Sequence, residues 1–271
     1  MFKYNRIAAA LLAGFVATAA QASLEMDPRE IMRKNEDARK SLNESAQMKM
    51  TLLDKSNNAR YRWIDFIADD TDPFNRKSLI RFSQPNDIKG TGFLSIEQGN
   101  EEDDLRWLYL PSLRKIRRIS AGNKTDSFMG TDWWYEDFEF VDGVAKGGNN
   151  NYKILREEEM NGARCWVIEA IPTTEQEIKE SGYSKRLMWV RQDNYVLTRE
   201  EKFDKKGELA KIQIATEIKQ IPGEENAWRA HRLEMVTVKT GHKTLIEYSS
   251  YQANVALPEG AFSTRYLEQA R

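Results

Sequence analysis

The sequence predicts a mainly β protein, built as a single half-open antiparallel β-barrel of about eleven strands with a helical lid. Short runs rich in β-branched and aromatic residues alternate apolar with polar side chains, and Gly, Pro, Asn or Asp bound them. Asn161-Gly162 joins two such runs and is a strong hairpin signal. The runs also lack the intervening helices that a parallel sheet needs, which disfavours a Rossmann-type architecture.

The barrel follows from the size of the sheet. A sheet of about eleven strands has two faces, and the sequence offers few helices to cover one of them. We therefore expect the sheet to curl until helical pieces close its concave face. A cavity between the sheet and these pieces is the natural consequence.

The N-terminal residues have the pattern of a secretory signal peptide. Lys3 and Arg6 give a positive start, and the apolar stretch over residues 7–20 is shorter than the ~20 residues that a spanning helix requires. The small residues Ala20 and Ala22 suit cleavage after Ala22. We therefore expect an exported protein, and an uncleaved membrane anchor is the disfavoured alternative.

The remaining chain is expected to form one domain, so that residues 1–22 are the signal peptide and residues 23–271 the domain. Its only cysteine, Cys165, lies in an apolar run and is expected to be a buried small residue, and a single thiol allows no internal disulfide. The 41 Lys and Arg nearly balance the 42 Asp and Glu, which argues against a nucleic-acid partner.

One amphipathic helix precedes the strands. Asp27 suits its cap and Pro28 its first turn, and a sparse apolar stripe continues to about Asn43. The β-rich runs that follow cover residues 46–52, 59–67, 77–82, 92–96, 105–110, 115–119, 152–158, 164–171, 186–191, 196–203, 209–218, 228–238 and 244–251. Residues 120–150 are rich in glycine and predict a long loop with a short helix near Asp132 to Phe138.

Motifs for catalysis, metals and cofactors are missing or fail on context. His231 and His242 have no second His or Cys at ligand spacing, and no Gly-x-Ser-x-Gly elbow occurs. The glycines around Thr91 precede a strand instead of the helix that a dinucleotide site needs, and the acidic groups fall at turns. We predict no catalytic residues, no metal site and no cofactor.

Residues 105–138 mix aromatic, basic and acidic side chains. Arg114, Arg117 and Arg118 form a candidate patch for an anionic head group or a docking partner; the alternative is a charged strand face paired with the acidic turns. Among the acidic residues, Asp132, Glu136 and Asp137 could pair with these arginines and hold a lid shut.

The apolar and aromatic residues of this region and of the first strands suit the wall and lid of a cavity for acyl chains, which need broad apolar contact. An ordinary core is the alternative. The candidate lipid-binding residues are Met50, Leu52, Trp63, Trp107, Tyr109, Trp133, Trp134 and Phe138.

The order of four motifs resembles the LolA-like family of outer-membrane lipoprotein-sorting proteins. These motifs are Pro85 to Gly92, Trp107 to Pro111, Arg114 to Ile119 and Gly130 to Asp137. The resemblance implies a half-open, roughly eleven-stranded barrel covered by helices. It also implies a periplasmic carrier of lipid or lipoprotein acyl chains, working with an inner-membrane RND/MMPL-type transporter or an outer-membrane acceptor.

The function expected from these residues and from the resemblance is a non-enzymatic carrier that binds acyl chains in a hydrophobic cavity for transport toward the outer membrane. A lipid-sensing periplasmic adaptor or regulator of a membrane protein complex is the alternative. A hydrolase of envelope lipid or glycan is a third class, for which the sequence shows no motif.

Overall fold

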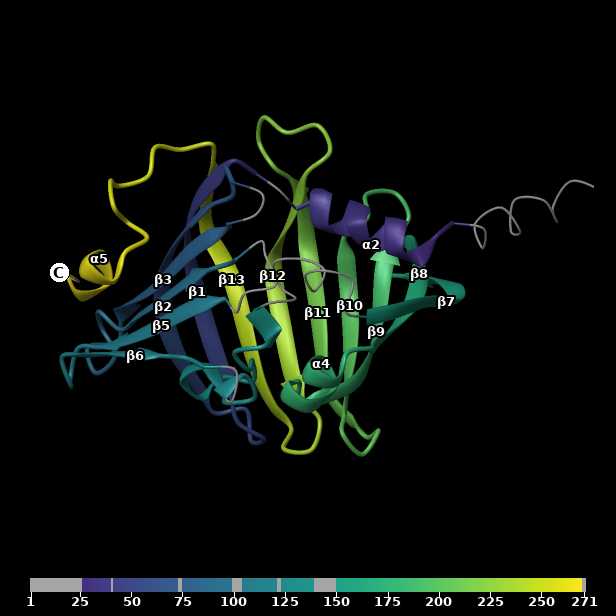
Figure 1. Cartoon of the computed structure of the whole chain (residues 1–271), viewed down its shortest axis with the longest axis horizontal. Coiled ribbons are helices and arrows are strands. Elements are labelled where there is room, and N and C mark those ends of the chain that lie inside the picture. The colour runs from purple at the N-terminus through teal and green to yellow at the C-terminus, as the bar shows by residue number, and fades with distance from the viewer. Residues whose placement is uncertain are drawn as a thin grey trace, which may run out of the picture.

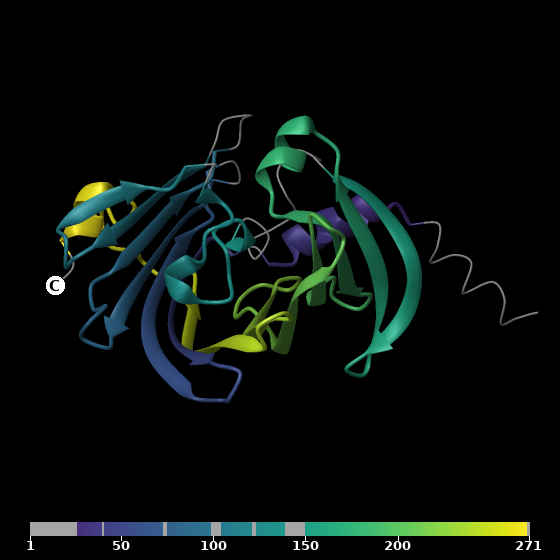
Figure 2. The ribbon, with the colours of Figure 1, turned by 90° about the horizontal axis from the view of Figure 1, so that it is seen from below.

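The computed structural model describes residues 26–39, 41–72, 75–98, 104–120, 123–138 and 150–269. The predicted signal peptide lies outside these residues. One antiparallel sheet dominates the fold, with the strand order β6-β5-β4-β3-β2-β1-β13-β12-β11-β10-β9-β8-β7. It curves around a concave face without closing, because the edge strands β6 and β7 are not paired with each other in the described part of the chain (Figures 1 and 2).

The first half of the sheet consists of β1 (Asn43–Leu53), β2 (Ala59–Asp69), β3 (Lys77–Gln84), β4 (Gly92–Ile96), β5 (Leu105–Leu110) and β6 (Lys115–Arg118). The second half consists of β7 (Asn150–Met160), β8 (Ala163–Pro172), β9 (Tyr183–Arg191), β10 (Leu197–Asp204), β11 (Leu209–Gln220), β12 (Trp228–Thr237) and β13 (His242–Ala253). Pairing of β1 with β13 joins the two halves. The helices are α2 (Pro28–Asp37), the 3-10 turn η2 (Phe128–Gly130), α4 (Glu175–Glu180) and α5 (Thr264–Glu268).

The mainly β, half-open architecture predicted from the sequence is confirmed, but the strand count of about eleven is too low. Thirteen strands form, because every β-rich run, including the four-residue β6, pairs separately. The Asn161-Gly162 hairpin is also confirmed, since both residues have positive φ, as a tight two-residue turn requires.

Helix α2 covers part of the concave face. Asp27 caps it and Pro28 occupies its first turn, as predicted, but it ends at Asp37, and Asn43 already belongs to β1. Its buried side chains Ile31 and Met32 pack against apolar residues of β8 and β9. The helix therefore covers one end of the strands around β8 and β9 (Figure 1).

The opposite, convex face has its own cover at the C-terminal end of the chain. Leu267 of α5 packs against Leu79 and Leu94. A Cβ atom added at Gly92 would lie 2.5 Å from Leu267 Cδ1, so only glycine allows this close approach.

Candidate functional site

The concave face holds a cavity of about 1130 Å³ of empty space, part of which is open to solvent. Its apolar wall comes from both halves of the sheet and includes Met48, Phe66, Ile80, Phe93, Leu233 and Ile246. Strand register explains this wall, because Phe66 faces Ile80 and Ile80 faces Phe93 on neighbouring strands. Inward positions on adjacent strands thus form one continuous apolar surface.

One end of the cavity is polar. The next inward row of the same strands places Ala68 opposite Ser78, Ser78 opposite Ser95, and Ser95 opposite Arg106. Arg39, after α2, and Arg229, on β12, line the same cavity. The site is therefore amphiphilic, with an apolar body beside a row of small and cationic side chains.

The segment from Ser127 to Phe138, here called the plug, lies on the concave face. Phe128, Tyr135 and Phe138 pack around Phe93, with ring centroids 5.3 to 5.8 Å from it. Phe138 also lines the cavity. Residues 132–136 form bends, a bridge and a turn, and helical residues begin only at Asp137, so the short helix predicted near Asp132 to Phe138 starts later than expected.

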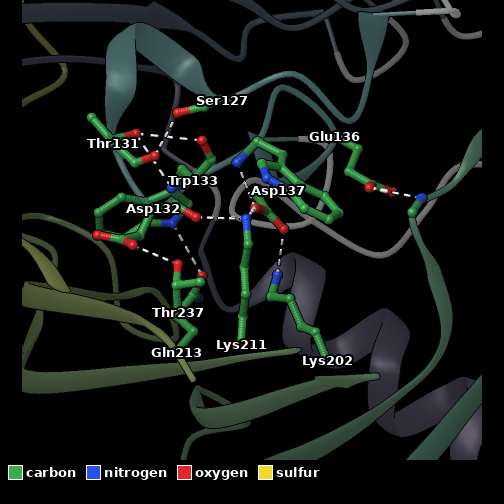
Figure 3. Close-up of polar contacts among 12 residues, drawn as sticks. Ser127, Thr131, Asp132, Trp133, Glu136, Asp137, Lys202, Lys211, Gln213 and Thr237 are labelled. Atoms are coloured by element: carbon green, nitrogen blue, oxygen red, sulfur yellow. Dashed lines mark hydrogen bonds and ion pairs between the residues drawn. The ribbon is translucent and has the colours of Figure 1, made fainter. Parts of the chain in front are cut away.

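Asp132 fastens the middle of the plug to the sheet. Its carboxylate accepts hydrogen bonds from the hydroxyls of Thr237 and Thr244, the latter at 2.7 Å, and its carbonyl oxygen accepts one from Lys211 Nζ at 2.6 Å (Figure 3). The indole of the buried Trp133 donates to Gln213 Oε1 at 3.3 Å. Strands β11, β12 and β13 thus hold the plug through side chains.

Asp137 is the most deeply buried anchor, with no exposed surface. Its carboxylate accepts hydrogen bonds from Lys202 Nζ at 2.9 Å, Lys211 Nζ at 3.3 Å, Tyr183 Oη at 3.0 Å and the backbone N–H of Trp134 at 2.7 Å. Burial opposes its charge, yet the two ammonium groups hold its pKa well below the usual range. Burial lowers the pKa of Lys211 to about 8.

The ion pairs continue from Asp137 across β10 and β9. Lys202 contacts Glu200 at 3.0 Å, Glu200 contacts Arg186 at 3.1 Å, and Arg186 lies 3.8 Å from Glu136. Burial raises the pKa of Glu136, which also accepts hydrogen bonds from Ser181 and the Gly182 N–H. A chain of alternating buried charges therefore fixes the plug to the sheet.

A protein-family model described as "Uncharacterized protein" matches residues 75–269. The chain belongs to this family. No curated protein sequence matches it.

Solved structures share the fold over most of the chain. A crystal structure from Vibrio parahaemolyticus, which carries the name outer membrane lipoprotein-sorting protein domain, is 29% identical, covers 89% of this chain and 97% of its own, and has a TM-score of 0.79. A DUF1329 family protein from Desulfovibrio piger is 27% identical, covers 89% and 100%, and has a TM-score of 0.79.

A LolA superfamily protein from Nitrosomonas europaea has the same fold at 19% identity. The match covers 89% of this chain and 99% of that one, with a TM-score of 0.64. This structure confirms the fold that the resemblance to the LolA-like family implies, and the resemblance itself is supported by the lipoprotein-sorting domain from Vibrio parahaemolyticus.

The sheet of this family member brings together five of the eight candidate lipid-binding residues. Met50 and Leu52 are buried in the concave cluster around Phe93, and Phe138 packs against that cluster. Trp133 and Trp134 lie in the plug, where Trp134 stacks on Tyr183 with centroids 5.0 Å apart. Of these five, Phe138 lines the cavity directly.

The other three, Trp63, Trp107 and Tyr109, lie on the convex face. Alternation along β5 turns Leu108 inward, so Trp107 and Tyr109 face outward and pack in the cluster beneath α5. Trp63 is 39% exposed and pairs with Tyr61. The placement of Trp107 and Tyr109 in the cavity wall is therefore wrong.

The three candidate docking arginines lie in and beside the edge strand β6. Arg114 has positive φ in the tight turn before it, and Arg117 and Arg118 are exposed on opposite faces. Within the described ranges, none of the three makes an ion pair and none lines the cavity. The predicted pairing with Asp132, Glu136 and Asp137 is wrong, because those carboxylates are satisfied from β9 to β13.

Sequence reasoning missed the residues that hold the plug and those at the polar end of the cavity. Lys202 and Lys211 occupy inward positions of their strands. Polar residues at alternate positions ordinarily mark the solvent face of a strand, so no signal in the sequence indicates that these lysines are buried. The described residues contain no group of three or more potential metal ligands. Among those same residues, no helix is long and apolar enough to cross a bilayer.

Proposed function

We propose that this protein is a non-enzymatic periplasmic carrier that binds lipid or lipoprotein acyl chains in its concave cavity and moves them toward the outer membrane. The observation that carries the proposal is the amphiphilic cavity on the concave face, with its continuous apolar wall. Each buried CH₂ group would contribute about 0.8 kcal/mol, so affinity grows with chain length. The name of the Vibrio parahaemolyticus relative supports the same role.

In this proposal a signal peptide directs export of the carrier and is cleaved after Ala22. The mature carrier exchanges its cargo with membrane proteins. An inner-membrane transporter of the RND/MMPL type is the proposed donor, and an outer-membrane protein is the proposed acceptor. The absence of a bilayer-spanning helix from the described residues is compatible with such shuttling.

In this proposal the plug is a fixed part of the cavity wall and not its moving cover. Lifting it would expose the carboxylate of Asp137 and leave Lys202, which has no exposed surface, without that partner. Separating a buried ion pair costs several kcal/mol. Acyl chains should therefore reach the cavity without displacing Trp133 and Trp134.

The test is lipid uptake by a variant with a filled cavity. Ala215 lines the cavity on β11, opposite Leu233 of the apolar wall, so Ala215→Trp places an indole on the cavity side of the sheet. Ala210→Trp, on the convex face of β11, is the matched control. We expect the first variant to lose both the uptake of a fluorescent fatty acid and the co-purified lipid seen in native mass spectrometry. The second variant should retain both.

Lipid binding that is equal in the two variants would exclude this cavity as the site. Absence of any bound lipid in the wild-type protein, together with no uptake of the fluorescent fatty acid, would exclude a carrier altogether.

An adaptor function is the second candidate, favoured by the exposed basic edge strand. Edge strands present unpaired backbone groups that a partner can extend, and Arg117 and Arg118 add charge there. Charge reversal at both arginines should abolish binding to a membrane partner and leave lipid uptake intact if this candidate is correct.

A further inference from the structure

We propose that the polar end of the cavity binds the phosphate of an acyl lipid, so that the cargo is an amphiphile with a phosphate-bearing head group. This inference rests on the proposed carrier function and specifies its ligand. It places the head group inside the cavity, away from the exposed arginines of β6 that the sequence had indicated.

The strand register builds the space for a head group. The apolar row from Phe66 through Ile80 to Phe93 is followed, two residues further along each strand, by the row Ala68, Ser78 and Ser95. Ala68, Ser78 and Ser95 are smaller than the residues of the apolar row, so they leave more space where the apolar wall ends. The two serine hydroxyls also supply hydrogen-bond donors there. An acyl chain along the first row therefore brings its head group to the second.

Three guanidinium groups surround this space. Arg106 ends the small-residue row, and Arg39, just after α2, and Arg229, on β12, line the same cavity. Glu97 is the one carboxylate among the described lining residues. The balancing carboxylates Glu44 and Asp104 do not line the cavity. The cavity wall itself therefore carries three guanidinium groups and one carboxylate.

The guanidinium groups are held in place before a ligand arrives. Arg106 Nη2 lies 2.6 Å from Asp104 Oδ2, and Arg229 Nη2 lies 2.5 Å from Glu44 Oε2. Arg229 is buried, yet its Nε has no hydrogen-bond partner in the described structure. Because a guanidinium group has five N–H donors, Arg229 keeps a donor for a ligand beside its contact with Glu44.

Phosphate suits this arrangement better than carboxylate. A lipid phosphate offers several non-bridging oxygens that can accept from cations on different sides, whereas a carboxylate offers two coplanar oxygens. Arg–phosphate hydrogen bonds are also charge-assisted and frequently bidentate. Cations from the segment after α2, from β5 and from β12 thus match a tetrahedral anion held between them.

The experiment compares two probes that differ only in the phosphate: phosphatidic acid and diacylglycerol with the same short acyl chains. Binding to delipidated protein is measured by isothermal titration calorimetry. We expect phosphatidic acid to bind at least about tenfold more tightly than diacylglycerol, equivalent to about 1.4 kcal/mol.

The variants test whether the polar end supplies this difference. Arg39→Gln should weaken phosphatidic acid binding about tenfold and leave diacylglycerol binding unchanged. Arg106→Gln is combined with Asp104→Asn, so that no buried carboxylate is left unpaired. Arg117→Gln, on the exposed edge strand, is the matched control and should change neither affinity.

Equal binding of the two probes, or equal loss of both in the cavity variants, would overturn the inference while leaving the carrier function intact. Binding of neither probe would contradict the carrier function itself. Inorganic phosphate at millimolar concentration is the final competitor: displacement of phosphatidic acid by it would assign the site to the free anion, and no displacement supports the lipid.

Discussion

Replacement of Asp137 by asparagine should be the most damaging isosteric change in the plug. The substitution removes the negative charge that Lys202 and Lys211 share, and both lysines stay buried. Breaking a buried pair by removing one partner costs about 3–5 kcal/mol. Lys202 retains Glu200 at 3.0 Å, so we expect a loss near the lower end, about 3 kcal/mol.

The assay is urea and thermal unfolding, followed by tryptophan fluorescence and circular dichroism. For a domain of this size about 3 kcal/mol corresponds to a fall in Tm of roughly 6–12 °C. Asp126→Asn is the matched control, because Asp126 lies in the same region but is exposed. It should change the free energy of unfolding by less than about 0.5 kcal/mol.

The reasoning would be refuted if Asp137→Asn lost less than about 1 kcal/mol and matched Asp126→Asn. That result would mean that the two lysines find water or other acceptors without the carboxylate. The plug could then detach at low cost, and a movable cover over the cavity would again be a serious interpretation.

Three further predictions concern pH, packing and the cavity. The pKa of Lys211 is lowered to about 8 in the folded protein, so between about pH 8 and the ordinary pKa of lysine the unfolded chain binds more protons than the folded one. The free energy of unfolding should therefore rise with pH across that window, and urea titrations of Lys211→Met should not show this rise. Gly92→Ala should destabilise the protein by about 1–3 kcal/mol through its clash with Leu267, and adding Leu267→Ala should leave less than the sum of the two losses. Phe93→Ala should weaken binding of a fluorescent fatty acid, whereas Trp107→Ala should leave it unchanged in protein that remains folded, because only Phe93 lines the cavity; equal loss in both would contradict the assignment of faces.

The strands were predictable from sequence because alternation and turn chemistry are local. The hairpin at Asn161-Gly162 needs no knowledge of the rest of the chain, and the same is true of the cap at Asp27. Which face of a strand meets the cavity is not local. In β5 both faces carry large apolar residues, Leu108 inside and Trp107 outside, and only the cover that α5 provides makes the outer ones unavailable to a ligand.

The partners of the plug were unpredictable for a related reason. More than sixty residues separate Asp137 from Lys202 and from Lys211 in the sequence. The contacts form because the folded sheet places β10 and β11 next to a segment that precedes them in the chain. Nearby arginines such as Arg117 were the obvious candidates by proximity in sequence. Asp137 instead pairs with the buried lysines of the concave face. The concave face excludes water from an ion pair, whereas the exposed edge strand β6 cannot.

The division of the concave face explains how one sheet can carry both a rigid core and a ligand cavity. Helix α2 covers the apolar residues of β8 and β9, and the plug covers Phe82 and Phe93. Between these covers, the apolar cavity wall, which includes Phe66, Ile80, Leu233 and Ile246, faces empty space. An apolar surface of this kind is costly to leave in water unless something fills it. The buried charges that hold the plug on β10 and β11 thus leave this wall uncovered.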